Sequence, residues 1–276
     1  MSWSGKLTLR YHFDGNRTVS HDSHEGPLRV LARLYPEAPS ICHHVLVHPP
    51  GGVVGGDTLA VSIAVDDAAH ALVTTPGATR FYRSAGASAA QQVDVKVAGA
   101  ARFEWLPLET LVYSGALAQN RIRFELAPCA EMIGWDLVAL GLPASQLAFA
   151  RGSYTQEIDL PGVWLERGRV DADDSLLLDS PLGWAGRRVM ATMWFASGSD
   201  IAAGLRQGLL DDTLAATVGA DAQVTAGATS PHARVVLLRV LSSRVEPAMQ
   251  LLQSVWSNWR DRAWQLEACA PRVWRT

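Results

Sequence analysis

Hydrophobic and polar residues alternate along several short segments in the first two thirds of the chain. This period of two is typical of strands with one buried face. Turns rich in glycine, proline and aspartate separate the segments, and this regular spacing predicts a large antiparallel β architecture. The polar residues 20–26 are expected to form a loop. The clearest alternating segments are residues 6–13, 58–65, 92–97 and 121–126.

The last third of the chain changes to a helical period. Apolar residues recur three and four positions apart over residues 201–210, and Ser199 or Asp200 is the expected N-cap. Residues 234–241 predict one strand whose continuous apolar centre indicates burial on both faces. A second apolar helical face follows over residues 248–259.

These patterns predict a mainly β chain of the α+β class, folded as a single domain over residues 1–276. A β-rich body would cover about residues 1–195, and a helix–strand–helix region about residues 199–265. No internal repeat of fixed period is visible in the sequence.

Composition narrows the class of protein. Of the 276 residues, 48% are hydrophobic and 18% are charged, which indicates a globular chain rather than a disordered one. The net charge of −3 argues against a general nucleic-acid-binding protein. No signal peptide and no apolar run of membrane-spanning length is visible. The three cysteines are odd in number and far apart, so a cytoplasmic location is expected.

The most unusual segment is HPPGGVVGGD at residues 48–57. Four glycines within six residues indicate a tight connection with close backbone contacts. The segment lacks the Lys-Ser/Thr pair of a P-loop, and Asp57 would repel a phosphate. It therefore predicts either a structural β connection, which we favour, or a loop that lines a site or partner surface.

Three histidines lie close together at His43, His44 and His48. Neutral imidazole suits nickel and zinc, so a metal site is one interpretation. In a strand, His44 and His48 would face the same side, two pleats apart, and His43 the other side. That spacing is loose for chelation, so hydrogen-bonded or surface histidines are favoured, and contact of any of the three with metal stays open.

Two further sequence patterns can each be interpreted in more than one way. Residues 171–175 resemble part of a calcium-binding loop, but the required glycine and glutamate are missing, so a solvated acidic turn is favoured. Tryptophans and arginines interleave over residues 256–275, where core packing is favoured over a protein interface, and nucleic-acid stacking ranks last. No spacing singles out a catalytic triad.

Five segments, in order along nearly the whole chain, resemble the UreD (UreH) family of urease accessory proteins. They are HPPGGVVGGD at 48–57, TTPGATRFYR at 74–83, EWLPLETLV at 104–112, MIGWDLVALGLPAS at 132–145 and PRVWRT at 271–276. The resemblance implies a long, twisted, mostly antiparallel β assembly with two helices toward the C-terminal end.

The resemblance also implies a function. Family members are non-enzymatic cytoplasmic scaffolds that bind UreF, which recruits the GTPase UreG, and dock this assembly on apo-urease. Nickel would pass through the scaffold toward the urease active site, with no permanently bound cofactor and only transient Ni²⁺. Neither nucleic acid nor membrane is an expected partner.

Asp57 and Glu109 lie in matched motifs and are the candidates for a transient nickel route or for partner contact. A strand-end hydrogen bond or a surface charge is the simpler interpretation of each carboxylate. The other motif and interface candidates are Pro50, Gly51, Gly52, Gly55, Gly56, Thr75, Pro76, Gly77, Arg80, Tyr82, Arg83, Trp105 and Trp135. Two rival functions stay open, namely a metal-dependent hydrolase on a β scaffold and a β-rich interaction module without a metal role.

Overall fold

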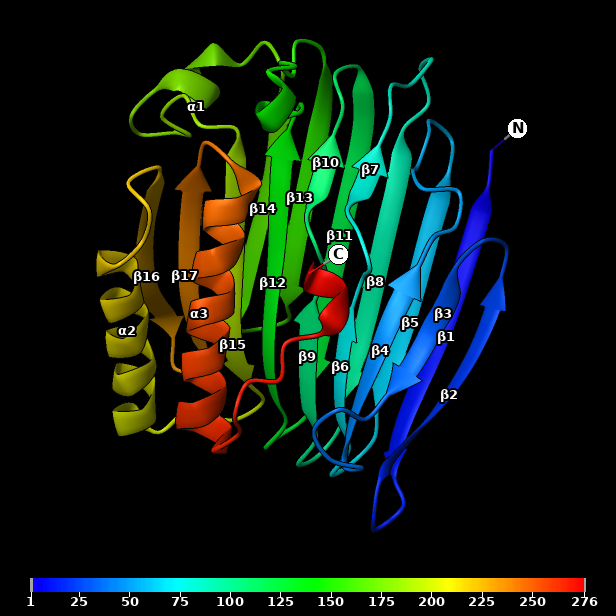
Figure 1. Cartoon of the computed structure of the whole chain (residues 1–276), viewed down its shortest axis with the longest axis vertical. Helices are drawn as coiled ribbons and strands as arrows, with labels where there is room; N and C mark the ends of the chain where they lie inside the picture. Colours follow the sequence, from blue (N-terminus) through cyan, green and yellow to red (C-terminus); the bar gives the residue numbers. More distant parts are fainter. Residues whose placement is uncertain (1, 276) are drawn as a thin grey trace.

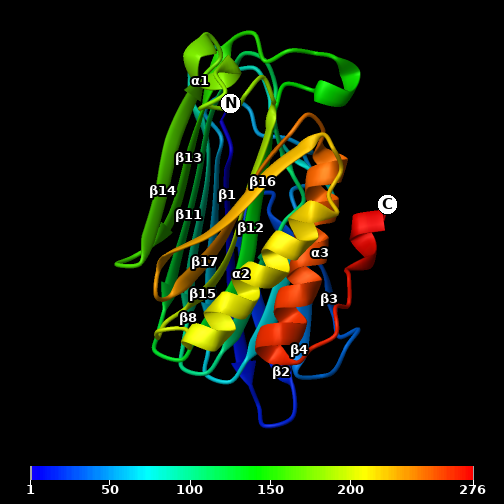
Figure 2. The same ribbon diagram turned by 90° about the vertical axis from the view of Figure 1, so that its left-hand side faces the viewer.

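Two β-sheets lie face to face, and two long helices cover the outer face of one of them (Figures 1 and 2). The computed structural model describes residues 2–275, so Thr276, the last residue of the C-terminal motif, lies outside the described residues. The expected mainly β fold with two helices in the last third of the chain is confirmed.

The first sheet contains seven strands in the described part of the chain and leaves its outer face to solvent. In spatial order they are β14 (Trp164–Asp171), β13 (Gly152–Leu160), β11 (Ala116–Leu126), β8 (Ala89–Val97), β5 (Thr58–Val65), β1 (Ser4–Phe13) and β2 (Thr18–Glu25). Side chains of β1 and β5 alternate between buried and more exposed positions, which is why the period of two was readable in the sequence.

The second sheet contains ten strands in residues 2–275 and lies in the middle of the molecule. Its main path is β16 (Val224–His232), β17 (Val235–Ser242), β15 (Val189–Ser197), β12 (Glu131–Leu140), β9 (Arg102–Leu106), β6 (His70–Thr74), β4 (Ile41–Val47) and β3 (Arg29–Leu34), with β10 (Thr110–Val112) and β7 (Thr79–Phe81) beside it. Because both faces of this sheet are covered, β12 and β15 are buried almost throughout.

The antiparallel prediction is wrong for most of the body. From β4 to β13 the chain passes back and forth between the sheets, so it re-enters each sheet in the same direction and pairs in parallel. Thr58, Ala90 and Gln119 therefore lie side by side in one row. Successive turns of the chain thus repeat in structure, although the residues at equivalent positions differ. Antiparallel pairs join the strands at both ends of the assembly.

Two apolar cores hold the three layers together. One lies between the sheets and includes Leu9, Phe103 and Trp194. The other lies between the second sheet and the helices α2 (Ala203–Val218) and α3 (Val245–Trp264), and it includes Trp135 and Trp259. Ten residues of α3 are buried, so this helix is the main cover of the sheet.

Two local predictions are wrong, and a third is incomplete. Residues 20–26 do not form a loop, because all but Gly26 belong to the edge strand β2, which pairs with β1. Neither Ser199 nor Asp200 caps α2, whose N-cap is Ala202 without a side-chain hydrogen bond. The strand predicted over residues 234–241 is confirmed as β17, but its hairpin partner β16 was not predicted. The short elements are α1 (Ser175–Asp179), η1 (Pro143–Ser145) and η2 (Arg272–Arg275).

Candidate functional site

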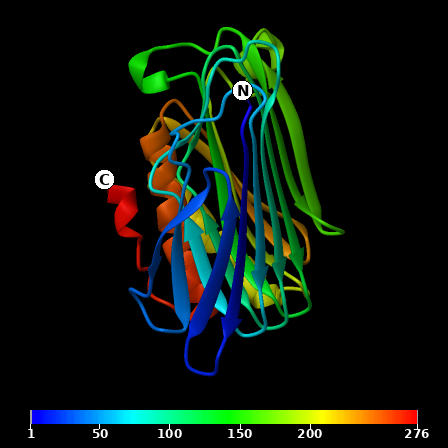
Figure 3. The same ribbon diagram turned by 90° about the vertical axis from the view of Figure 1, so that its right-hand side faces the viewer.

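From β4 to β13 the chain winds as a coil that passes alternately through the two sheets. This coil topology brings four of the five sequence motifs to one edge of the molecule. Each passage from the second sheet to the first occurs there, through residues 48–57, 75–88, 107–115 and 141–151. We call these four segments the coil edge. They lie at the upper end in Figures 1 and 3, together with the N-terminus. Motifs far apart in sequence thus form one continuous surface.

Two of these segments are joined directly through their backbones. The Val53 N–H donates to the Arg80 carbonyl at 2.7 Å, and the Tyr82 N–H donates to the Val53 carbonyl at 2.9 Å. The Tyr82 ring lies so close to Gly52 that a Cβ there would be 2.1 Å from the ring Cε2. The backbone at Gly56 has φ +95°, which favours glycine. The glycines are therefore required by close contact and backbone geometry.

Replacing Gly52 by alanine should destabilise the protein by about 1–3 kcal/mol, because the new methyl group would overlap the Tyr82 ring. Gly77 in the facing segment is the matched control, since a Cβ there would meet nothing within 4 Å. We expect Gly77→Ala to change the free energy of unfolding by less than about 0.5 kcal/mol. Urea unfolding of both variants tests this, and equal losses would contradict the packing argument.

Asp57 closes the glycine loop. Its side chain is buried, and its two carboxylate oxygens accept hydrogen bonds from the Trp3 N–H at 2.8 Å and the Val54 N–H at 3.0 Å. The strand-end hydrogen bonding that the sequence suggested as the simpler role of Asp57 is therefore observed. Both oxygens have backbone donors, so charge reversal at Asp57 would disturb the loop as well as any ion route.

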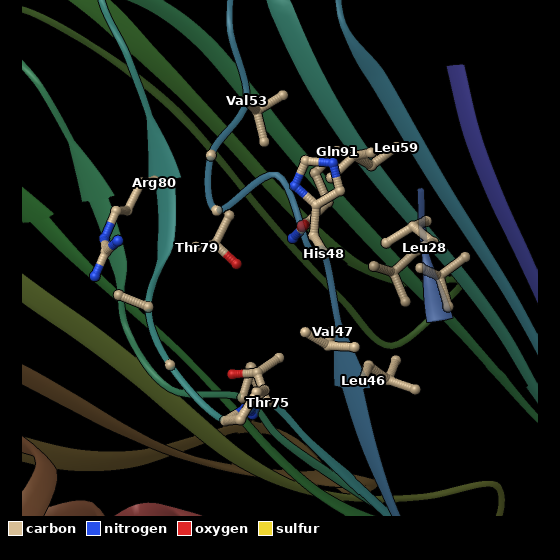
Figure 4. Close-up of a pocket in the computed structure, with 18 of the residues that line it drawn as sticks. Leu28, Leu46, Val47, His48, Val53, Leu59, Thr75, Thr79, Arg80 and Gln91 are labelled. Atoms are coloured by element: carbon tan, nitrogen blue, oxygen red, sulfur yellow. The ribbon is translucent and has the colours of Figure 1, made fainter. Parts of the chain in front are cut away.

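A cavity of about 240 Å³ lies beneath the joined loops, where the two glycine motifs meet the space between the sheets. His48, Thr79 and Gln91 are polar groups in a wall that is otherwise largely apolar (Figure 4). The Arg80 guanidinium points away from His48 in the same view. Trp105, one of the motif candidates, also lines the cavity.

Only one of the three clustered histidines lines this cavity. His43 is buried and lies 2.6 Å from the Glu37 carboxylate, and His44 is buried between the Tyr11 and Ser20 hydroxyls. Burial lowers the pKa of His44 to about 4. His48, just past the end of β4, lines the cavity, and burial lowers its pKa although the Asp57 charge partly opposes this. At neutral pH His48 is therefore a neutral imidazole.

A row of polar side chains, half-buried at Gln91 and buried at Asn120, Asp136 and Gln156, continues inward from the cavity. Gln91 Nε2 donates to Asn120 Oδ1 at 3.2 Å, and Asn120 Nδ2 donates to Asp136 Oδ1 at 3.1 Å. Gln156 Nε2 donates to the other Asp136 oxygen. We call Gln91, Asn120, Asp136 and Gln156 the interior polar row. Its members come from β8, β11, β12 and β13, so it bridges the two sheets.

Asp136 is the only carboxylate of this row. Burial, reinforced by the negative charge of Glu166, raises its pKa to about 7, although the two amide donors oppose the shift. Glu166 in turn accepts a hydrogen bond from the Thr192 hydroxyl at 3.1 Å and pairs with Arg239. Asp136 therefore keeps its proton to a higher pH than an ordinary carboxyl group does.

Buried polar atoms without partners lie in the same inter-sheet core. Among the described residues, the Tyr154 hydroxyl and the indole N–H groups of Trp105 and Trp194 are buried and have no hydrogen-bond partner. Native cores usually contain few such groups, and each one requires an explanation.

Our sequence reasoning missed the interior polar row, although a signal was present. Asn120 lies two residues from the inward-facing Ala118 and Ile122, and Gln156 lies between Tyr154 and Ile158 in the same way. A polar residue at an inward position of an alternating strand is the signal that could have identified it. Asp136 lies in the motif at residues 132–145, but no local pattern marks it as a site residue.

Glu109 is not brought together with Asp57. It lines a separate groove of about 540 Å³ between the η1 turn, α3 and Trp274, whereas Asp57 lines neither that groove nor the cavity. No hydrogen bond or ion pair of the Glu109 carboxylate occurs within residues 2–275, and Glu246 lines the same groove. Trp135 supports this region from below, because its indole N–H donates to the Pro107 carbonyl at 2.7 Å.

The remaining motif candidates stabilise the coil edge or extend its surface. The Thr75 hydroxyl accepts from the Leu108 N–H at 2.9 Å, and the Tyr82 and Tyr113 rings lie 4.8 Å apart. A Cβ at Gly55 would be 2.3 Å from the Ser84 hydroxyl. The exposed members are Pro50, Gly51, Gly77, Arg80 and Arg83, while Gly56 and Pro76 are half-buried.

The acidic segment 171–175 and the tryptophan-rich segment 256–275 both have structural roles. Asp174 caps α1 by accepting from the Leu177 N–H at 2.9 Å. Trp256, Trp259 and Trp264 are buried in the core beneath α3, as predicted.

No group of three or more His, Cys, Asp or Glu side chains in residues 2–275 is arranged to hold a metal ion. No helix in that part of the chain is long and apolar enough to span a membrane.

Comparison with known proteins places this chain in one family. The model of the family described as UreD urease accessory protein matches residues 4–275. The chain is 58% identical to the urease accessory protein UreD of Leptothrix cholodnii over 278 residues, covering 100% of both chains. It is 55% identical to the UreD of Variovorax paradoxus over 276 residues, again covering 100% of both. The chain belongs to the UreD family of urease accessory proteins.

Proposed function

We propose that this chain is a maturation scaffold that docks UreF and UreG on apo-urease and passes Ni²⁺ through its own interior. Family membership supports the urease maturation role. The observation that carries the nickel step is the continuous line from the His48 cavity through the interior polar row to Asp136. Acting by binding and transfer, such a scaffold needs no catalytic residue.

The chemistry of this line suits a cation in transit. Imidazole nitrogen and carboxylate or amide oxygen are ligands that nickel accepts, and His48 is neutral at pH 7. A single carboxylate among amides binds a divalent cation only weakly, so the ion can both arrive and leave. A cation at Asp136 would also displace the proton that its raised pKa retains near pH 7.

Glu109 and Asp57 keep separate places in this proposal. The Glu109 carboxylate, beside Glu246 in the groove under α3, would contact a partner or hold an ion at the protein surface. Asp57 would act through the loop that it closes above the cavity, because its oxygens already accept two backbone hydrogen bonds. Its direct contact with nickel stays a prediction.

Omission of the chain tests the function. The urease gene cluster of the source organism is expressed with and without this chain, and the activity and nickel content of purified urease are measured. We expect both to collapse without the chain, and the chain to co-purify with apo-urease. Full maturation without it would contradict the proposal. Turnover by the purified chain alone would favour a metal-dependent hydrolase, and partner binding without any effect on nickel would favour a plain interaction module.

A further inference from the structure

The charges of the coil edge differ in sign from those of the whole chain. The protein carries a net charge of −3, yet the four segments of the coil edge contain three exposed arginines, Arg80, Arg83 and Arg151. Their only acidic residues are the buried Asp57 and the half-buried Glu109. The coil edge is therefore a basic surface on an acidic protein.

The three arginines are also free of internal partners. Within the described residues, none of their guanidinium groups forms a hydrogen bond or an ion pair, whereas most other arginines of the chain do. The guanidinium groups remain available to carboxylates from outside.

Two of the arginines are neighbours on a rigid base. The Arg83 side chain lies against Gly115, where a Cβ would be 2.6 Å from the Arg83 Cγ. The Gly115 N–H donates to the Arg151 carbonyl at 2.6 Å, and the Ser84 N–H donates to the Gly115 carbonyl at 2.9 Å. Backbone hydrogen bonds thus fix the three connections relative to one another. A fixed backbone beneath the two cations lowers the entropy lost when they bind an anionic group.

Apolar and aromatic side chains accompany these cations. Trp3 is 54% exposed, Val54 40% and Leu147 59%. Val54 and Leu147 belong to the coil edge, and the Trp3 N–H donates to Asp57 of the same edge. The half-buried Tyr82 and Tyr113 pack against each other beside Arg83. Arginine, tyrosine and tryptophan are the residues most enriched at the centres of protein interfaces.

We infer that the coil edge is a docking surface for a protein partner whose contact segment combines carboxylates with apolar side chains. The partners meant are those of the proposed scaffold function, on which this inference rests. A nucleic acid fits less well, because three arginines are few for phosphate tracking and the exposed Leu147 and Val54 match apolar side chains. The cations would orient the partner, and the apolar residues would supply buried area.

Double charge reversal tests the surface. The tagged chain is co-expressed with the urease gene cluster, and its share in complexes with urease and accessory proteins is measured as parent, Arg83→Glu/Arg151→Glu and Arg83→Lys/Arg151→Lys. We expect the glutamate variant to reduce complex formation by about tenfold or more, because reversal places like charges in contact. The lysine variant keeps the charge and should retain most of the complex. Complexes of the parent should also weaken as salt rises.

A matched control carries the same change of charge elsewhere. Arg206 on α2 and Arg10 on β1 lie outside the coil edge, and Arg206→Glu/Arg10→Glu should leave the complexes intact. Unchanged complexes with Arg83→Glu/Arg151→Glu, or complexes that dissolve on nuclease treatment, would overturn the inference. If the parent chain forms no complex at all, the scaffold function itself fails, which is a different result from a parent complex that survives charge reversal.

Discussion

Replacing Arg260 by methionine should lower the free energy of unfolding by about 3–5 kcal/mol, because it leaves two carboxylates without their shared cation. The Arg260 side chain is fully buried on α3. Its guanidinium donates to Glu37 at 2.8 Å and to the Glu267 carbonyl at 2.9 Å, and it lies 3.4 Å from Glu104. One side chain thus joins the helix to the second sheet and to the segment before β4.

The carboxylates of this cluster depend on the arginine charge. Burial alone would raise the pKa of Glu104, but hydrogen bonding to His70 and the positive charge of Arg260 hold it below the usual value. Burial lowers the pKa of His70, so the neutral imidazole provides a hydrogen bond at 2.7 Å rather than a second cation. Without Arg260, Glu104 would be a buried charge with only neutral donors.

Arg262 on the same helix provides the control. It also pairs with a carboxylate, Asp212, but its side chain is 42% exposed, so Arg262→Met should cost less than about 1 kcal/mol. Urea unfolding at pH 7 measures both variants. Comparable losses in the free energy of unfolding would contradict the prediction that the buried cluster contributes more than the exposed pair. A gain in stability with Arg260→Met would show that apolar packing stabilises this position better than the ion pairs do.

Replacing Asp136 by asparagine should flatten the pH dependence of stability. Because the folded protein raises this pKa to about 7, it holds the proton more tightly than the unfolded chain does. The resulting stability is present below about pH 4 and is lost as the pH rises toward 7. The rise of the Asp136 pKa from 3.8 to about 7 corresponds to roughly 4 kcal/mol.

Asparagine has no proton to lose, so the variant should be at least as stable as the parent at pH 8. Part of the gain is offset, since the asparagine amide can accept from only one of Asn120 and Gln156 unless the other turns. Unfolding free energies at pH 5, 6, 7 and 8 measure the effect, with Asp94→Asn, exposed on β8, as control. A constant difference between parent and Asp136→Asn across this range would contradict the assignment.

The sequence predicted strands and faces better than it predicted pairing. Residues 58–65 match β5, because an alternating strand has only one side to bury. Whether that strand pairs in parallel depends on the route the chain takes through the other sheet, which no local pattern records. Strand β2 was missed for a related reason, since its polar residues 20–25 lie at an edge and are held by pairing with β1.

The candidate site was only partly readable. The glycine motifs marked the coil edge correctly, because close approach of Tyr82 requires Gly52. The distinction among His43, His44 and His48 required knowing where β4 ends and what lies on each face. The interior polar row joins residues of four strands, and their meeting is a property of the coil rather than of any segment.

The nickel content of urease matured with Asp136→Asn is the most direct measurement of the proposed route. The urease gene cluster is co-expressed with the parent chain, Asp136→Asn or the exposed control Asp94→Asn, and bound nickel per urease active site is determined by metal analysis. If nickel passes Asp136, urease from the Asp136→Asn cells should approach the nickel content seen without the chain, although the variant folds and still binds urease. Full nickel loading with a folded Asp136→Asn chain would contradict passage through the interior polar row.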